Sequence, residues 1–160
     1  MTRVDFYILP DADPAQRPLL ACRLAEKACG QGLKVYVHTA TEGEALHLDE
    51  LLWTFRDGSF LPHAIAKGAI AKGTDPDFAE SAKSGSVPVL VPVLVGHDHE
   101  PSTHTDVLIN LGAEVPRFFG RFERVAELVD QRPEQLALSR ERYRFYRERG
   151  YELNSHQLKR

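Results

Sequence analysis

Short runs of apolar residues recur along the chain and predict buried strands. Residues 4–9, 34–40 and 106–112 are each rich in β-branched, aromatic or leucine side chains, the pattern of strands covered on both faces. A fourth run, residues 87–95, contains two prolines, which cannot donate to a strand ladder. We therefore expect this run to form a bent or interrupted strand at an edge of the sheet.

Apolar residues at intervals of three and four predict helices between these strands. Residues 14–31 carry such a row. Thr41 and Glu44 have the T-x-x-E spacing of a capping box, which predicts a helix that starts there and continues through Trp53. Residues 60–66 fit a short strand or a loop, and residues 67–86 are small, polar and irregular in pattern.

Two further helices are predicted in the last third of the chain. The first would carry one apolar stripe made of Phe118, Phe122, Val125, Ala126 and Val129. The second would begin with Pro133 as its first helical residue and end near Gly150.

Strands that alternate with helices favour a mostly parallel sheet covered on both faces. We expect one three-layer α/β domain of Rossmann-like build over residues 1–160. Such folds bind nucleotides through a glycine-rich turn after the first strand. The corresponding turn here, PDADPAQ at residues 10–16, contains two aspartates and no glycine, so we expect no nucleotide-binding loop and no cofactor.

The net charge and the two cysteines limit the kinds of partner and the cellular compartment that we expect. The formal net charge is −3, so binding to a polyanion would require a local basic feature. Cys22 and Cys29 are too far apart on a helix for a disulfide, and we expect free, buried thiols in a reducing compartment. Neither a signal peptide nor a membrane-spanning run is recognisable, which favours a cytoplasmic protein without membrane contact.

A histidine-rich segment, GHDHEPSTHTD, is the strongest candidate for a metal site. Its imidazole and carboxylate groups are ligand types that suit zinc or another divalent ion. Their spacing matches no established metal motif, and an ordinary loop is the competing interpretation. The candidate ligands are His97, Asp98, His99, His104 and Asp106.

The final predicted helix has a basic face with an aromatic residue in it. The stretch RERYRFYRERG places Arg140, Tyr143, Arg144 and Arg147 within an arc of about 100°, with Leu138 and Phe145 on the opposite side. Such a face suits a negatively charged group beside an apolar one. Residues 140–149 contain five arginines and two glutamates, a local excess of three positive charges that fits a short acidic peptide better than a long polyanion.

Four stretches together resemble one protein family, the chi subunit of bacterial DNA polymerase III. They are FYILPDAD, LDELLWTFRDGSFLPH, DVLINLG and RERYRFYRERGYELN, and they extend from residue 6 to residue 154. The resemblance implies a non-catalytic accessory subunit of the clamp-loader assembly that links it to single-stranded-DNA-binding protein. It also implies that DNA is contacted at most indirectly.

The resemblance implies two protein-binding surfaces. Arg140, Tyr143 and Arg144 would bind the acidic C-terminal tail of single-stranded-DNA-binding protein, which ends in Pro-Phe, with Val129 on the preceding helix as an apolar wall. Family members can carry a further basic residue one turn earlier, where this chain has Leu136.

The second surface would bind the psi subunit or an equivalent clamp-loader partner through Trp53, Phe60 and Pro62. Two alternatives remain open at the level of sequence. One is a metal-dependent enzyme that uses the loop from His97 to Asp106, and the other is a direct binder of single-stranded nucleic acid.

Overall fold

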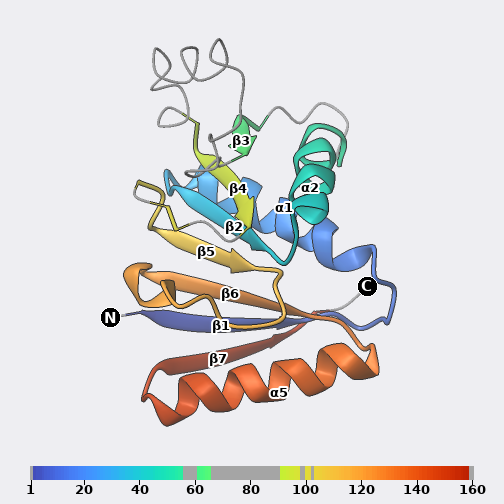
Figure 1. Ribbon diagram of the computed structural model, residues 1–160, viewed down its shortest axis with the longest axis vertical. Coiled ribbons are helices and arrows are strands. Elements are labelled where there is room, and N and C mark those ends of the chain that lie inside the picture. The colour runs from blue at the N-terminus through green and yellow to red at the C-terminus, as the bar shows by residue number, and fades with distance from the viewer. Residues whose placement is uncertain (1, 56–60, 66–90, 98–99, 102, 159–160) are drawn as a thin grey trace.

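The structure is a computed structural model that describes residues 2–55, 61–65, 91–97, 100–101 and 103–158. Within these residues, seven strands form one sheet in the order β3-β4-β2-β5-β6-β1-β7, and every neighbouring pair is parallel (Figure 1). The strands are β1 (Arg3–Ile8), β2 (Val35–Thr39), β3 (His63–Ile65), β4 (Val93–His97), β5 (Val107–Asn110), β6 (Arg124–Val129) and β7 (Glu152–Gln157).

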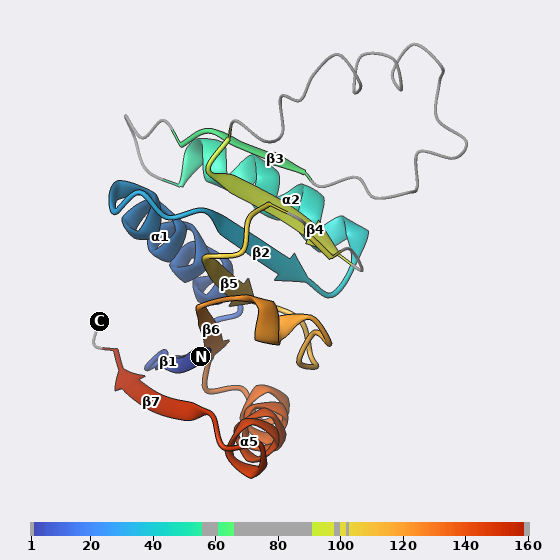
Figure 2. The same cartoon turned by 90° about the vertical axis from the view of Figure 1, so that its left-hand side faces the viewer.

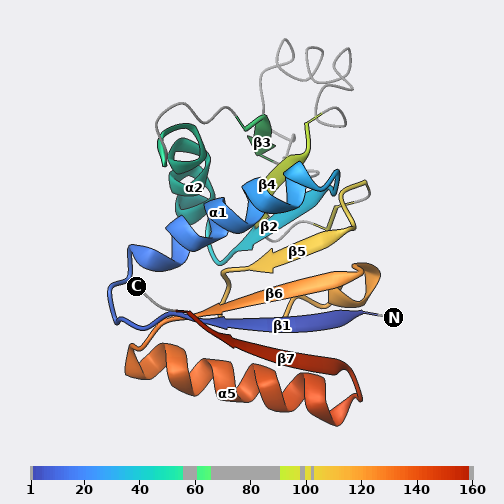
Figure 3. The same ribbon diagram turned by 180° about the vertical axis from the view of Figure 1, so that it is seen from behind.

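Helices cover both faces of the sheet. Helices α1 (Gln16–Gly30) and α2 (Glu42–Thr54) pack on one face, which is turned toward the viewer in Figure 3. Helix α5 (Pro133–Glu148) packs beside β6 and β7 on the other face, together with the short 3-10 helix η2 (Phe119–Arg121) (Figure 2). The mostly parallel three-layer α/β fold predicted from the sequence is therefore confirmed.

The alternating side chains of the strands divide the core into two clusters. In β2, Val35 and Val37 join the cluster under α1 and α2, whereas Tyr36 points to the opposite face. There Tyr36 meets an aromatic group that includes Phe118 and Phe122. Both faces of each central strand are thus buried, which explains why these strands have continuous apolar sequences.

The helix predicted around Phe118, Phe122 and Val125 is wrong. Residues 124–129 form strand β6, which pairs with β5 on one side and β1 on the other. Residues 125–129 are all buried, because this central strand is covered on both faces, and the run therefore shows no alternation that would reveal a strand. Phe118 and Phe122 flank η2 rather than lying on an α-helix.

The edge position predicted for residues 87–95 is also wrong. Residues 93–95 of this run belong to β4, which lies between β3 and β2. Pro92 immediately precedes the strand, so its missing N–H removes no ladder donor, while its carbonyl accepts a hydrogen bond from Val35 N at 2.8 Å. The edge is formed by the three-residue strand β3, and residues 66–90 lie outside the described part of the chain.

The ends of α2 and α5 follow the sequence signals. Thr41 Oγ1 accepts a hydrogen bond from Glu44 N at 3.1 Å, while Glu44 Oε2 accepts one from Ala40 N at 3.0 Å, so the predicted cap forms with its return bond shifted by one residue. Pro133 opens α5, and Gly150 follows it with φ of 78°, a backbone conformation that favours glycine. Strand β7, beyond this glycine, was not predicted.

Candidate functional site

Helix α5 presents the basic face that the sequence predicts. Arg140, Tyr143, Arg144 and Arg147 are all exposed, and 39% of the Tyr143 surface is accessible. Leu138 and Phe145 are half-buried on the other side of the helix. The most deeply buried residues of α5 are Arg142 and Tyr146, at 3% and 0% exposure.

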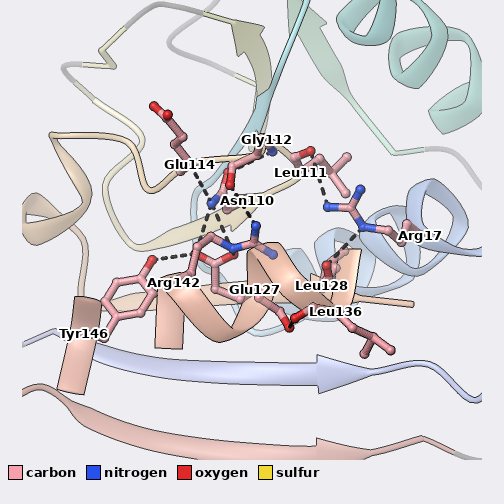
Figure 4. A network of polar contacts seen from close by, with 12 residues as sticks. Arg17, Asn110, Leu111, Gly112, Glu114, Glu127, Leu128, Leu136, Arg142 and Tyr146 are labelled. Atoms are coloured by element: carbon pink, nitrogen blue, oxygen red, sulfur yellow. Dashed lines mark hydrogen bonds and ion pairs between the residues drawn. The ribbon is translucent and has the colours of Figure 1, made fainter. Parts of the chain in front are cut away.

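A buried polar network holds α5 against β6 (Figure 4). Glu127 of β6 is fully buried, and its Oε1 lies 2.8 Å from Arg142 Nε. Tyr146 donates its hydroxyl hydrogen to Glu127 Oε2 at 2.5 Å, and Asn110 Nδ2 donates to the same oxygen at 3.0 Å. Burial raises the pKa of Glu127, an effect that the charge of Arg142 and the hydrogen bonds from Asn110, Tyr146 and Arg142 oppose.

This network is not predicted from the sequence, where Arg142 counts among the five arginines of residues 140–149. A signal was present, because Arg142 and Tyr146 are four residues apart and fall outside the arc of Arg140, Tyr143 and Arg144. The Arg142 charge is paired with Glu127, so the basic character of the face comes from the exposed arginines.

A groove of about 150 Å³ lies between α5 and the sheet. Arg140 and Tyr143 line it from α5, and Val129 lines it from β6. Val129 therefore belongs to a strand, and the prediction that placed it on a preceding helix is wrong. The other lining residues are Phe6 and Ile8 of β1, Leu136 and Ser139 of α5, and Ser155 of β7.

The groove combines apolar walls with one cationic group at its rim. Phe6 and Tyr143 form a tilted aromatic pair with ring centroids 5.4 Å apart. Leu136 occupies the position at which family members can carry a further basic residue, and here it adds to the apolar lining. Three of the four predicted residues, Val129, Arg140 and Tyr143, thus meet in one groove, whereas Arg144 is exposed but does not line it.

The second predicted surface includes an exposed tryptophan. Trp53 is 48% exposed, and its ring centroid lies 4.2 Å from that of His63. Leu48 and Leu52 fill the inner side of α2, so Trp53 lies at the margin of this helix, as predicted. Pro62 is exposed, and Phe60 lies outside the described residues.

The described part of the histidine-rich loop has structural contacts instead of a metal cluster. His104 is fully buried, with Nε2 2.5 Å from the Val91 carbonyl oxygen and Nδ1 2.8 Å from Thr103 Oγ1. Asp106 Oδ2 accepts a hydrogen bond from Lys34 N. Among the described residues, no group of three or more histidine, cysteine, aspartate or glutamate side chains is arranged to hold a metal ion. Asp98 and His99 lie outside them.

One aspartate closes the turn before α1, and the two cysteines are free as predicted, although Cys22 is buried and Cys29 is only half-buried. Asp13 Oδ1 accepts a hydrogen bond from Ala15 N at 3.0 Å, so one aspartate of the glycine-free turn takes up a backbone donor beside the helix start. Cys22 and Cys29 are free thiols. Burial raises the pKa of Cys22 to about 12 and that of Cys29 to about 11, which leaves both thiols protonated at neutral pH.

No described helix has both the length and the apolar character needed to cross a membrane.

Solved structures of similar fold support the fold class. The T4 UvsW protein aligns over 98% of this chain and 41% of its own, with a TM-score of 0.65 and 11% identity. The second helicase domain of a DEAD-box protein aligns over 98% of this chain and 64% of its own, with a TM-score of 0.64 and 12% identity. The chain is thus an α/β protein with the Rossmann-like sheet found in helicase domains, a likeness of fold alone.

Sequence relatives identify the family. The model of the family described as "DNA polymerase III chi subunit, HolC" matches residues 1–154, and the chain belongs to this family. It is 45% identical over 160 residues to DNA polymerase III subunit chi of Pseudomonas aeruginosa, covering 100% of this chain and 99% of the relative. The protein of the same name from Escherichia coli is 30% identical, with 97% of each chain covered. Members of this family are accessory subunits of DNA polymerase III and not its catalytic subunit.

Proposed function

We propose that this chi-family protein is an adaptor that binds the acidic C-terminal tail of single-stranded-DNA-binding protein in the α5 groove. The observation that carries the proposal is the meeting of Val129, Arg140 and Tyr143 around one apolar groove. A tail that ends in phenylalanine requires an apolar pocket and a cation within reach of the same residue, because its side chain and its terminal carboxylate share one Cα.

The groove offers both parts. Arg140 is exposed at the rim, and a guanidinium can donate two parallel hydrogen bonds to a carboxylate. Phe6, Val129 and Tyr143 supply apolar and aromatic surface for the phenylalanine ring. The exposed Arg144 and Arg147 lie one and two turns further along α5, where they add positive potential for the acidic residues that precede the chain end.

The surface around Trp53 fits a second protein partner, which the family resemblance assigns to the psi subunit or an equivalent of the clamp loader. A half-exposed tryptophan is a typical centre of a protein interface, and the Trp53 ring packs on His63, which follows the exposed Pro62 in the chain. An adaptor needs two separate surfaces, and the one at α2 and the one at α5 lie on opposite faces of the sheet (Figure 2). We assign residues 1–160 to one domain, with DNA contacted at most through its partner, in the cytoplasm where replication takes place.

Isothermal titration calorimetry with an acidic peptide ending in Pro-Phe tests the proposal. Wild-type protein should bind it, and deletion of the terminal phenylalanine should weaken binding more than replacement of one upstream aspartate by asparagine. Arg140→Ala should weaken binding by roughly 10- to 100-fold, since a hydrogen bond to a charged group contributes about 1.5–3 kcal/mol.

Arg149→Ala is the matched control, because the Arg149 guanidinium lies over the Phe145 ring, 3.6 Å from its centroid, on the side of α5 away from the groove. Equal affinity of wild type and Arg140→Ala, or indifference to the terminal phenylalanine, would contradict the proposal. A single-stranded oligonucleotide that binds where the peptide does not would favour direct nucleic-acid binding.

A further inference from the structure

A second cavity lies just beyond the carboxyl end of β6, on the α1 face of the sheet. Its volume is about 350 Å³, and it is bounded by the start of α1, the first turns of α2 and the segments that follow β5 and β6. These segments meet at the carboxyl ends of the parallel strands, the edge at which α/β folds place their ligands. The cavity shares no lining residue with the α5 groove.

Arg17 lines this cavity and is an unusual arginine. It is 8% exposed, its Nε donates to the Leu128 carbonyl oxygen at 3.0 Å, and its Nη2 donates to the Leu111 carbonyl oxygen at 3.3 Å (Figure 4). Of the two arginines buried in the described part of the chain, Arg142 is paired with Glu127, whereas Arg17 has no carboxylate from that part of the chain within ion-pair distance.

The surroundings of Arg17 leave its charge only partly compensated. Burial, together with the positive charges of Arg142 and Arg132, lowers the pKa of Arg17 to about 10, although Asp130 and Glu127 oppose these effects. Arg17 is still cationic at neutral pH. The nearby Asp130 is already engaged by Arg132, whose Nη2 lies 2.8 Å from its Oδ2. Hydrogen bonds to two neutral carbonyl oxygens do not neutralise a buried guanidinium, and a bound anion would supply the missing opposite charge.

The other residues that line the cavity indicate which chemical group would carry the anion. Pro14, Pro18, Leu48 and Leu111 give the cavity an apolar lining beside the guanidinium. Arg132, part-exposed, adds a second positive charge at the rim. Glu44 also lines the cavity, but its carboxylate is held by Ala40 N as part of the α2 cap.

We propose that the cavity binds a carboxylate carried on an apolar body, with the carboxylate at Arg17 and the body against the prolines and leucines. The carboxylate can belong to a free small molecule or to a chain terminus, because both present the same group. This site is separate from the α5 groove and does not depend on its proposed role.

N-acetylphenylalanine and its amide are the probes, followed by the Nε–H signal of Arg17 in NMR spectra and by calorimetry. The carboxylate should bind about 10-fold or more tightly than the amide and should shift the Arg17 signal. Arg17→Met should abolish this preference, and Glu44→Gln, which removes a like charge but keeps the cap acceptor, should strengthen carboxylate binding several-fold without affecting the amide.

Glu44→Gln keeps the test valid if Arg17→Met fails to fold. These measurements are made in the Arg140→Ala background, because N-acetylphenylalanine also carries the side chain and carboxylate that the α5 groove is proposed to bind, so that the preference for acid over amide reports on the cavity. A neutral peptide ending in phenylalanine distinguishes the sources, since it binds only if the cavity admits a chain terminus. Equal binding of acid and amide in this background, or no response to Glu44→Gln, would each overturn the inference.

Discussion

Nε of Arg142 lies 2.8 Å from Oε1 of Glu127, an ion pair that joins helix α5 to the central strand β6 inside the core. The pair determines which side of α5 faces the sheet. It thereby determines which arginines remain on the surface, since Arg140, Arg144 and Arg147 point away from Arg142 around the helix and are exposed.

Arg142→Met should be strongly destabilising, because it leaves the carboxylate of Glu127 buried without its cation. The expected loss in the free energy of unfolding is about 3–5 kcal/mol, measured by urea denaturation. Arg144→Met is the matched control on the exposed side and should change stability by less than about 0.5 kcal/mol. Similar stability of the two variants would show that the buried pair does not fix α5.

The protein should lose stability as the pH falls below the ordinary histidine range, in part because of His104. Burial lowers the pKa of His104 from 6.5, so the unfolded chain takes up this proton before the folded protein does. The contribution is therefore present above about pH 6.5 and is lost as the pH falls toward the folded-state pKa. Urea denaturation at two pH values, about 7.5 and 5.5, should show a smaller change in His104→Gln than in wild type. An equal change in both proteins would exclude His104 as a cause.

Arg140 and Arg144 should contribute unequally to tail binding, although the sequence groups them together. Arg140 lines the groove and Arg144 does not. Arg144→Ala should therefore weaken the peptide by less than about 5-fold, as expected for a surface charge acting at a distance, against 10-fold or more for Arg140→Ala. Added salt should reduce the effect of Arg144→Ala more than that of Arg140→Ala. The reverse order in calorimetry would place the carboxylate away from the groove.

Leu136→Lys should increase affinity for the acidic peptide. Leu136 lines the groove one turn before Arg140, and the aliphatic stem of lysine can keep part of its apolar contact while the ammonium group reaches the rim. A gain of up to about 1 kcal/mol, or roughly 5-fold, is expected at low salt. Leu136→Met is the control that preserves the apolar contact without the charge. Equal affinity of the two variants would show that the groove does not meet the charged end of the tail.

Trp53→Ala should remove a partner contact with little loss of fold. Because Trp53 is 48% exposed, its replacement should lower stability by well under the roughly 3–5 kcal/mol expected for a buried aromatic residue. Phe122→Ala, at a position only 2% exposed, should show that full loss and serves as the comparison. Binding to the proposed clamp-loader partner, followed by calorimetry, should weaken by about 2 kcal/mol or more in Trp53→Ala. A severe loss of stability in this variant would assign Trp53 to the core.

The sequence by itself determined the class of fold, most of the elements and the family. Continuous apolar runs at 4–9, 34–40 and 106–112 can be buried only in a covered sheet, and Thr41, Pro133 and Gly150 fix helix ends through local hydrogen bonding and backbone geometry. The grouping of Arg140, Tyr143 and Arg144 also follows from helical periodicity alone. These features depend on neighbours in the chain, which a sequence displays directly.

Only the tertiary structure decided the features that depend on partners far apart in the chain. Residues 124–129 form a strand because β5 and β1 flank them, although their apolar spacing also fits a helix. Polar β7 is a strand because β1 offers it a free edge. The groove likewise exists only because α5, β6, β1 and β7 meet. Their packing places Val129 beside Arg140 and leaves Arg144 outside the groove. Local sequence decides which faces a helix or strand has, and long-range packing decides which of these faces is buried.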